Sequence, residues 1–296
     1  MTDTGNFAPA SVPALQSDLR SAGYLADRGL GTAALIALRL GRPLLLEGEV
    51  GVGKTELAKC LAALTGRELI RLQCYEGIDT HQALYEWDYA RQMLHVRALS
   101  EHALADVETV GSLYAEEFLL ERPLLRAVRA GGSAVLLIDE IDRADDEFEA
   151  FLLELLSDFQ VTIPELGTVV ADERPIVVLT SNRTRELHDA LKRRCLYHWI
   201  GYPTVSEEID IVRLRAPDVG EALTAKVVDA VHRLRSLDLA KPPGVAETLD
   251  WVEALGAVGA AELDAETAVD TLGSVIKDRD DLEFVAGDIA RIVPER

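Results

Sequence analysis

A short run of glycines followed by a lysine and a threonine contains the residues best suited to binding a phosphate group. Residues 48–55 read Gly-Glu-Val-Gly-Val-Gly-Lys-Thr, between an apolar run at 44–46 and a helix predicted over 56–64. Glycines permit a tight turn that directs several backbone N–H groups at one anion. The start of the following helix adds partial positive charge at the same place.

Two side chains of this loop would complete a site for a nucleoside triphosphate. Lys54 would reach the outer phosphates, and the Thr55 hydroxyl would be a ligand for Mg2+. A glycine-rich turn without a ligand is the alternative, but strand, loop and helix follow in the order that a phosphate-binding loop requires. The predicted nucleotide-binding residues are Gly48, Glu49, Val50, Gly51, Val52, Gly53, Lys54, Thr55 and Glu56.

Two adjacent acids follow the apolar run at 134–138, which is typical of a strand buried in a parallel sheet. The carboxyl ends of such strands form the ligand crevice of open α/β sheets. We expect Asp139 to hold Mg2+ through its water shell and Glu140 to act as general base on the attacking water. A solvated acidic turn is the alternative, and it is our interpretation of Asp142, Asp145 and Asp146.

Two further candidates follow along the chain. Asn182 ends the apolar run at 175–180, where its amide could contact the γ-phosphate or the attacking water, or simply form a turn. Arg193 and Arg194 belong to a basic cluster with Lys192. They could stabilise phosphate charge in the site of a neighbouring subunit, which requires a ring or at least a dimer. The alternative is that they cap the C-terminus of a helix.

The composition limits the class of protein. The chain has 296 residues, 48% of them hydrophobic, and a formal net charge of −21. We expect a globular protein, and the acidic surface disfavours nucleic acid as a general partner. The three cysteines lack zinc spacing and indicate a reducing compartment. No apolar run approaches the roughly 20 residues needed to span a bilayer, so we expect a soluble, cytoplasmic protein.

The alternation of strands and helices predicts an α/β fold with a parallel sheet. Strands are expected at 44–46, 68–73, 134–138, 175–180 and 197–200, which gives a parallel five-stranded sheet. We predict a loose tail over 1–17, a helix over 18–40 with breaks at Gly23, Gly29 and Gly31, an insertion over about 74–129 and a hairpin over 160–171. The predicted domains are the tail, an α/β domain over 18–203 and an all-helical domain over 204–296.

These motifs together resemble an AAA+ ATPase. Walker A lies at 48–55, Walker B at 135–140, Asn182 is similar to a sensor residue, and the Arg193-Arg194 pair follows it. The resemblance covers about 41–202, and the helical remainder is similar to the lid. The hairpin and the insertion resemble the helix-2-insert clade and, within it, MoxR-type ATPases. Residues 75–79 and 191–196 are similar to the carbon-monoxide-dehydrogenase accessory ATPases.

The resemblance implies ATP hydrolysis with Mg2+ by a hexameric ring. It also implies chaperone-like maturation of a protein client, often a metalloenzyme, and a partner with a von Willebrand factor A domain. The alternatives are a nucleotide-bound scaffold with little turnover and a nucleic-acid motor. One residue departs from the family pattern, since Glu247 stands where a sensor arginine is expected. Either Glu247 points away from the nucleotide, or Lys241 or Arg235 provides the contact, or the lid makes none.

Overall fold

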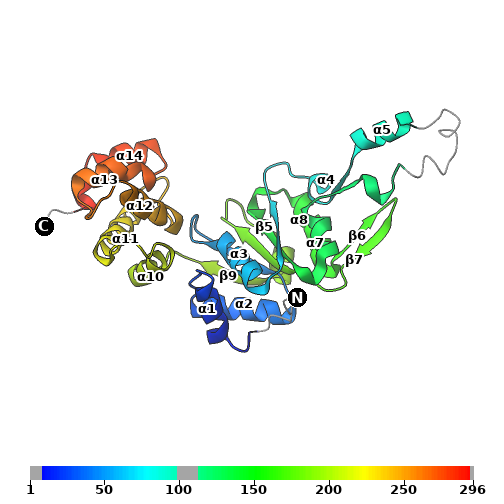
Figure 1. Cartoon of the computed structure of the whole chain (residues 1–296), viewed down its shortest axis with the longest axis horizontal. Coiled ribbons are helices and arrows are strands. Elements are labelled where there is room, and N and C mark those ends of the chain that lie inside the picture. The colour runs from blue at the N-terminus through cyan, green and yellow to red at the C-terminus, as the bar shows by residue number, and fades with distance from the viewer. Residues whose placement is uncertain (1–8, 99–112, 294–296) are drawn as a thin grey trace. The chain divides into compact units, whose positions relative to one another are not determined.

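The fold is described from a computed structural model, shown in Figure 1, whose described residues are 9–98 and 113–293. They form two compact units. The first comprises Ala26–Glu47 and the described parts of Met1–Asp18 and Leu57–His198, and the second comprises Leu19–Leu25, Gly48–Glu56 and the described chain from Trp199 onward. The domain limits expected from the sequence stay a prediction. Within the described ranges, no helix has the length and apolar character needed to cross a bilayer.

A five-stranded sheet forms the centre of the first unit, as predicted. Its strand order is β2-β5-β8-β1-β9. The strands are β1 (Leu44–Gly48), β2 (Glu68–Gln73), β5 (Ala134–Asp139), β8 (Ile176–Ser181) and β9 (Leu196–Ile200). The register is parallel between β2 and β5, β5 and β8, and β8 and β1, so the carboxyl ends of these strands share one edge.

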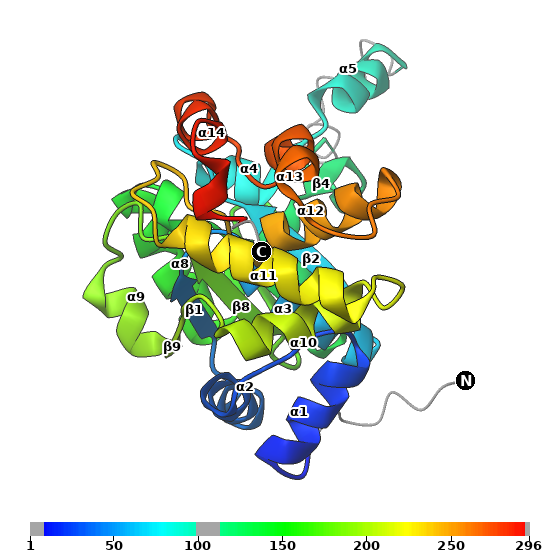
Figure 2. The ribbon, with the colours of Figure 1, turned by 90° about the vertical axis from the view of Figure 1, so that its left-hand side faces the viewer.

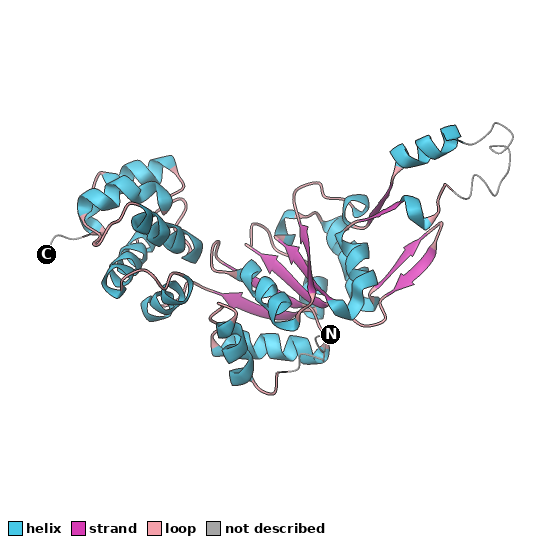
Figure 3. Cartoon of the chain, in the orientation of Figure 1, coloured by secondary structure: helices cyan, strands magenta, loops and turns pink. Residues whose placement is uncertain are grey.

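Apolar residues bury both faces of the central strands, because helices cover each side. Every residue of β1 and β5 is buried. On one face, alternate residues such as Leu136 and Ile138 join a core with α7 (Pro123–Ala130) and α8 (Asp146–Asp158). Figure 3 shows the strands gathered in this part of the chain between helices. The continuous apolar runs of the sequence therefore correspond to doubly covered parallel strands.

The N-terminal segment differs from the sequence-based prediction. The predicted tail is wrong for residues 12–17, because α1 (Val12–Ser21) begins inside it and buries Leu15 and Leu19 completely. The predicted helix over 18–40 is interrupted once, before α2 (Arg28–Leu40). Gly29 and Gly31 were expected to break the helix, but both lie within α2. This helix is capped by Asp27, whose side chain accepts a 2.6 Å hydrogen bond from the backbone N–H of Leu30.

The region expected as an insertion contains short elements, and its residues 99–112 lie outside the described part. After α3 (Lys54–Thr65) and β2 come α4 (Thr80–Ala83), β3 (Tyr85–Trp87), α5 (Tyr89–Ala98) and β4 (Leu119–Glu121). Within this region, β3 pairs in antiparallel fashion with the distant strand β4. The hairpin predicted over 160–171 is confirmed as β6 (Gln160–Ile163) and β7 (Gly167–Val170), followed later by α9 (Asp189–Arg194).

The described chain after β9 is helical, as predicted. It comprises α10 (Val205–Arg215), α11 (Glu221–Arg235), α12 (Val245–Ala257), α13 (Ala265–Thr271) and α14 (Arg279–Ala286). Figure 2 shows α10, α11 and α12 side by side, and apolar residues of these helices share one core that includes Trp251. A buried carboxylate, that of Glu208 on α10, holds the three helices together. It accepts hydrogen bonds from Arg235 of α11 and Thr248 of α12.

Candidate functional site

The glycine loop between β1 and α3 has the backbone that its sequence predicts. Gly51 and Gly53 have φ values of 75° and 90°, which favour glycine. A Cβ on Gly48 would lie 2.0 Å from the carbonyl oxygen of Ile200, so this position accepts no side chain. Lys54 is buried, and its ammonium donates to the carbonyl oxygens of Gly48 (2.9 Å) and Glu49 (2.6 Å). The lysine is therefore held over the loop.

The start of α12 contacts this loop within the second unit. The Ala246 N–H donates to the carbonyl oxygen of Gly51 at 3.1 Å. Glu247 turns back on its own helix, because its Oε2 accepts from the Gly244 N–H at 2.8 Å. This carboxylate would also lie 2.8 Å from a Cβ placed on Gly51. Glu247 therefore caps α12 beside the loop, where the family pattern has an arginine.

The two cations considered as substitutes for a sensor arginine have other partners. The Arg235 guanidinium binds both carboxylate oxygens of Glu208, at 2.6 and 2.8 Å, and its Cζ lies 4.5 Å from the centre of the Tyr202 ring. The Lys241 ammonium lies 3.4 Å from Asp278. Arg235 thus belongs to the buried core of the helical region, and Lys241 pairs on its surface.

Asp139 lies at the carboxyl end of β5 with its carboxylate almost completely buried. Its Oδ1 accepts from the Thr180 hydroxyl at 2.5 Å. Its Oδ2 accepts from two nitrogens of Arg71 on β2, Nε at 3.0 Å and Nη2 at 2.6 Å. Neighbouring strands supply these partners because Gln73 pairs with Asp139 and Leu179 with Ile138 across the sheet.

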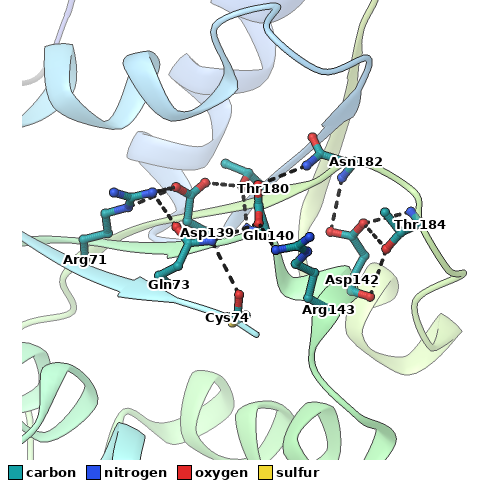
Figure 4. A network of polar contacts seen from close by, with 10 residues as sticks. All are labelled: Arg71, Gln73, Cys74, Asp139, Glu140, Asp142, Arg143, Thr180, Asn182 and Thr184. Carbon is teal, nitrogen blue, oxygen red and sulfur yellow. Dashed lines mark hydrogen bonds and ion pairs between the residues drawn. The ribbon is translucent and has the colours of Figure 1, made fainter. Parts of the chain in front are cut away.

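Glu140 follows in a left-handed conformation (φ 54°), and donors surround its carboxylate (Figure 4). Oε2 accepts from Gln73 Nε2 at 3.0 Å and lies 3.4 Å from Arg143 Nη1. Oε1 accepts from Asn182 Nδ2 at 3.3 Å. The structure therefore brings the predicted base and the predicted sensor together, and the backbone N–H of Glu140 also donates to the Thr180 hydroxyl at 2.9 Å.

The interpretation of Asp142 as part of a solvated turn is wrong. This side chain is buried and accepts from the N–H groups of Asn182 (3.2 Å) and Thr184 (2.8 Å), and from the Thr184 hydroxyl (2.8 Å). It anchors the loop after β8 and so places Asn182. Asp145 is exposed but caps α8 through the Phe148 N–H at 2.9 Å. Asp146 is exposed and lies 3.5 Å from Arg185.

Arg193 and Arg194 are exposed at the end of α9, in a different place from the acidic pair. The chain continues from them into the edge strand β9, and β8 and β1 separate β9 from β5 in the sheet. Arg42 fixes their backbone, because its guanidinium donates to the carbonyl oxygens of Arg193 (2.8 Å), Arg194 (3.2 Å) and Cys195 (3.3 Å). Their helix end is thus capped by another arginine, while their own side chains face solvent.

The site also contains three residues to which the sequence motifs assign no role: Arg71, Gln73 and Thr180. Arg71 and Gln73 are two residues apart at the carboxyl end of β2, so their side chains lie on the same face of the sheet. Polar residues at the carboxyl end of a predicted sheet strand were the available signal. Cys74 follows them, and burial together with Asp139, Asp142 and Glu140 raises the pKa of its thiol to about 12.

The side chains predicted to hold Mg2+ are of types that suit this ion when it is bound together with a nucleotide. Mg2+ is usually held by one or two protein oxygens, with water and phosphate completing its octahedron. Asp139 in the first unit offers a carboxylate, and Thr55 in the second unit offers a hydroxyl, each of a type that Mg2+ accepts. In the described ranges, no group of three or more His, Cys, Asp and Glu side chains is arranged to hold a metal ion alone.

Comparison with known families finds one match that covers the glycine loop and the acidic pair. Residues 43–195 match the model of the AAA domain, dynein-related subfamily. The chain belongs to the AAA domain family. This membership implies nucleotide binding, and the matched AAA domain contains the glycine loop, the acidic pair, Asn182 and the two arginines.

The AAA domain also has relatives among curated proteins. The chain is 28% identical over 213 residues to the uncharacterized protein YehL of Escherichia coli K12, covering 68% of this chain and 53% of YehL. It is 34% identical over 163 residues to chaperone protein ClpB 1 of Thermosynechococcus vestitus, covering 55% of this chain and 15% of that protein. The chain thus spans about half of YehL and a small part of ClpB.

Solved structures confirm the fold of the AAA domain and its helical continuation. A mutant of Thermotoga maritima RuvB superposes with a TM-score of 0.50 at 19% identity, covering 96% of this chain and 80% of that chain. At this identity the similarity concerns the fold alone.

Proposed function

We propose that this AAA protein hydrolyses ATP with Mg2+ and uses the cycle to remodel a protein client. One observation carries the proposal: Asp139, Glu140 and Asn182 form a single hydrogen-bonded group at the carboxyl ends of β5 and β8. The adjoining strand β1 continues directly into the lysine-containing loop. The groups proposed to activate water and to bind phosphate therefore follow the strands β5, β8 and β1, which are consecutive in the sheet.

The proposed roles follow from the chemistry of each group. The loop N–H groups and Lys54 would bind the β- and γ-phosphates, while Thr55 and Asp139 would hold Mg2+, Asp139 through water. Bound Mg2+ would neutralise charge on the phosphates. Glu140 would take a proton from the attacking water, and Asn182, which touches Glu140, would orient that water or the γ-phosphate. Arg193 and Arg194 would act on the phosphates of a neighbouring subunit.

The client and the assembly are the less direct part of the proposal. The ClpB relatives are chaperones by name, which supports action on a protein rather than on a small molecule. The motif resemblance favours a hexameric MoxR-type ring, acting in metalloenzyme maturation or complex assembly with a von Willebrand factor A domain partner. The net charge of −21 disfavours a nucleic-acid motor.

A second candidate is a nucleotide-bound scaffold with little turnover. The contacts around Glu140 favour it, because Gln73, Asn182 and Arg143 all direct positive or partly positive groups at its carboxylate. A base engaged in this way must first be released before it can accept a proton. The same contacts would describe the resting state of an active ATPase, so turnover decides between the two candidates.

The test compares Glu140→Gln with the wild-type protein and with Glu147→Gln, an exposed glutamate on α8. If Glu140 is the base, its variant binds ATP normally, while phosphate release falls by about 10²–10⁴-fold. The Glu147 variant should keep the wild-type rate. Normal turnover by Glu140→Gln would remove Glu140 from the mechanism. A wild-type protein that binds ATP but releases no phosphate, with or without client, would favour the scaffold.

A further inference from the structure

Arg71 makes an ion pair with the carboxylate that is proposed to hold Mg2+. Its Nε and Nη2 donate to the same oxygen of Asp139, at 3.0 and 2.6 Å, as Figure 4 shows. The Asp139 side chain is only 4% exposed, whereas that of Arg71 is 51% exposed. A buried carboxylate without a counter-charge is costly. Arg71 therefore supplies a counter-charge to Asp139.

The same guanidinium orients a second side chain. Arg71 Nη2 donates to Oε1 of Gln73, two residues along β2. This contact directs the amide nitrogen of Gln73 toward Glu140, and Nε2 donates to Glu140 Oε2 at 3.0 Å. An amide has one accepting and one donating end, so holding the oxygen fixes where the nitrogen points. Arg71 is thus connected to both acids, directly to Asp139 and through Gln73 to Glu140.

We propose that Arg71 is a positioning residue that opposes Mg2+ at Asp139 and couples arrival of the ion to release of Glu140. The inference rests on the proposed function, in which Asp139 holds Mg2+. Two cations beside one carboxylate repel each other strongly where the dielectric constant is low. The ion therefore binds more weakly while Arg71 remains in place. When Arg71 leaves Asp139, the Gln73 amide loses the contact that orients it. Gln73 can then release Glu140, the proposed base.

The exposure of the two partners decides which one moves. The Arg71 guanidinium is half exposed, so it can return to water at small cost. Asp139 is held from the other side by Thr180 on β8, and its own strand is buried at every residue. Mg2+ would thus meet a fixed carboxylate and a displaceable arginine.

The first experiment tests the ion pair in nucleotide-free protein. Thermal unfolding is compared for the wild type, Arg71→Met, Asp139→Asn and the double variant. Arg71→Met should lower the Tm in the wild-type background and have a much smaller effect in the Asp139→Asn background, where no charge remains to be compensated. An equal loss in both backgrounds would mean that Arg71 acts by packing, and the inference would be overturned.

The second experiment measures how much Mg2+ is needed for half-maximal binding of a fluorescent, non-hydrolysable ATP analogue. Arg71→Met should lower this concentration by about tenfold, since a competing unit charge is removed. Arg71→Lys should fall between the wild type and Arg71→Met. Arg126→Met is the matched control, because Arg126 pairs with Glu68 at the opposite end of β2 and both side chains are about half exposed. It should leave the Mg2+ requirement unchanged.

The outcomes separate this inference from the proposed function. In one outcome, the wild type binds the analogue only with Mg2+, and Arg71→Met needs the same or a higher Mg2+ concentration. The competition between Arg71 and Mg2+ for Asp139 is then overturned, while the proposed Mg2+ site stands. If the wild type binds the analogue equally well with and without Mg2+, the metal part of the proposed function and this inference are overturned together.

Discussion

The hydroxyl of Thr180 lies 2.5 Å from Asp139 Oδ1 and 2.9 Å from the backbone nitrogen of Glu140. It donates to the first acid and accepts from the N–H of the second, so one side chain of β8 holds both acids at the end of β5. All three groups are at the carboxyl edge of adjacent parallel strands. This hydroxyl therefore defines where the acidic pair stands relative to the sheet.

Thr180→Val keeps the shape of the side chain but removes both hydrogen bonds. The buried Asp139 oxygen and the Glu140 N–H then lose a partner, so we expect the free energy of unfolding to fall by about 1–3 kcal/mol. ATP turnover should fall as well, because Glu140 is less firmly placed. Urea denaturation and phosphate release measure the two effects. Thr180→Ser retains the hydroxyl and is expected to remain close to wild type; a fully stable, active valine variant would contradict this role.

Lys54→Ala should abolish nucleotide binding. Lys54 is held over the loop by the carbonyl oxygens of Gly48 and Glu49, where its ammonium is ready to exchange these partners for phosphate. Equilibrium titration with a fluorescent ATP analogue provides the measurement. The control is Lys59→Ala, which removes an exposed lysine from the same helix and should bind normally. Wild-type affinity in Lys54→Ala would argue against the glycine loop as the phosphate site.

Replacing Arg193 and Arg194 together by alanine should preserve ATP binding and lose hydrolysis. Their placement before the edge strand β9, with Arg42 fixing the backbone, suits action on a neighbouring subunit. Mixing this double variant with Glu140→Gln should partly restore phosphate release. In mixed assemblies the double variant supplies Glu140, and Glu140→Gln supplies the two arginines. Arg213→Ala serves as control, because Arg213 is an exposed arginine of α10 paired with Glu221. Full activity of a monomer would exclude the shared site.

Glu208→Ala should destabilise the helical region severely. The variant leaves the Arg235 guanidinium, which is 7% exposed, without its charged partner. Removing one member of a buried ion pair costs about 3–5 kcal/mol. The exposed pair of Asp229 and Arg233 on α11 is the control, and Asp229→Ala should cost about 0.5 kcal/mol or less. Urea unfolding compares them, followed by tryptophan fluorescence with Trp87 and Trp199 replaced by Phe in every variant so that Trp251 alone reports. Similar losses in both variants would argue against the buried carboxylate as the link between helices.

The buried thiol of Cys74 should make the protein less stable at high pH. Its pKa rises from 9.0 to about 12 on folding, through burial and the nearby acids. Above about pH 9 the thiol ionises in the unfolded chain but stays protonated in the folded one, so stability falls as pH rises. The free energy of unfolding should decline less between about pH 8 and 10.5 in Cys74→Ala than in the wild type. Equal slopes would mean that Cys74 does not retain its proton on folding.

The sequence predicted most of the elements that carry the candidate site. The glycine loop, the run before Asp139 and the strand before Asn182 are local patterns, because a strand buried on both faces must be apolar throughout. The same reasoning was wrong where packing outweighed local signals. Residues 12–17 look like a loose tail but form part of α1, since burial of Leu15 and Leu19 stabilises a helix there.

What the sequence by itself determined was therefore the order of elements, the position of the glycine loop and of the acidic pair, and membership in the AAA domain family. The partners of these groups were decided only by the tertiary structure. Arg71, Gln73 and Thr180 reach Asp139 and Glu140 because the parallel register places the ends of β2, β5 and β8 at the same level. Asp142 is likewise a buried anchor only because the loop after β8 packs against it and donates hydrogen bonds to its carboxylate. The contacts of Asp139 with Arg71 and Thr180 join residues 68 and 41 positions apart, and no local pattern encodes strand register.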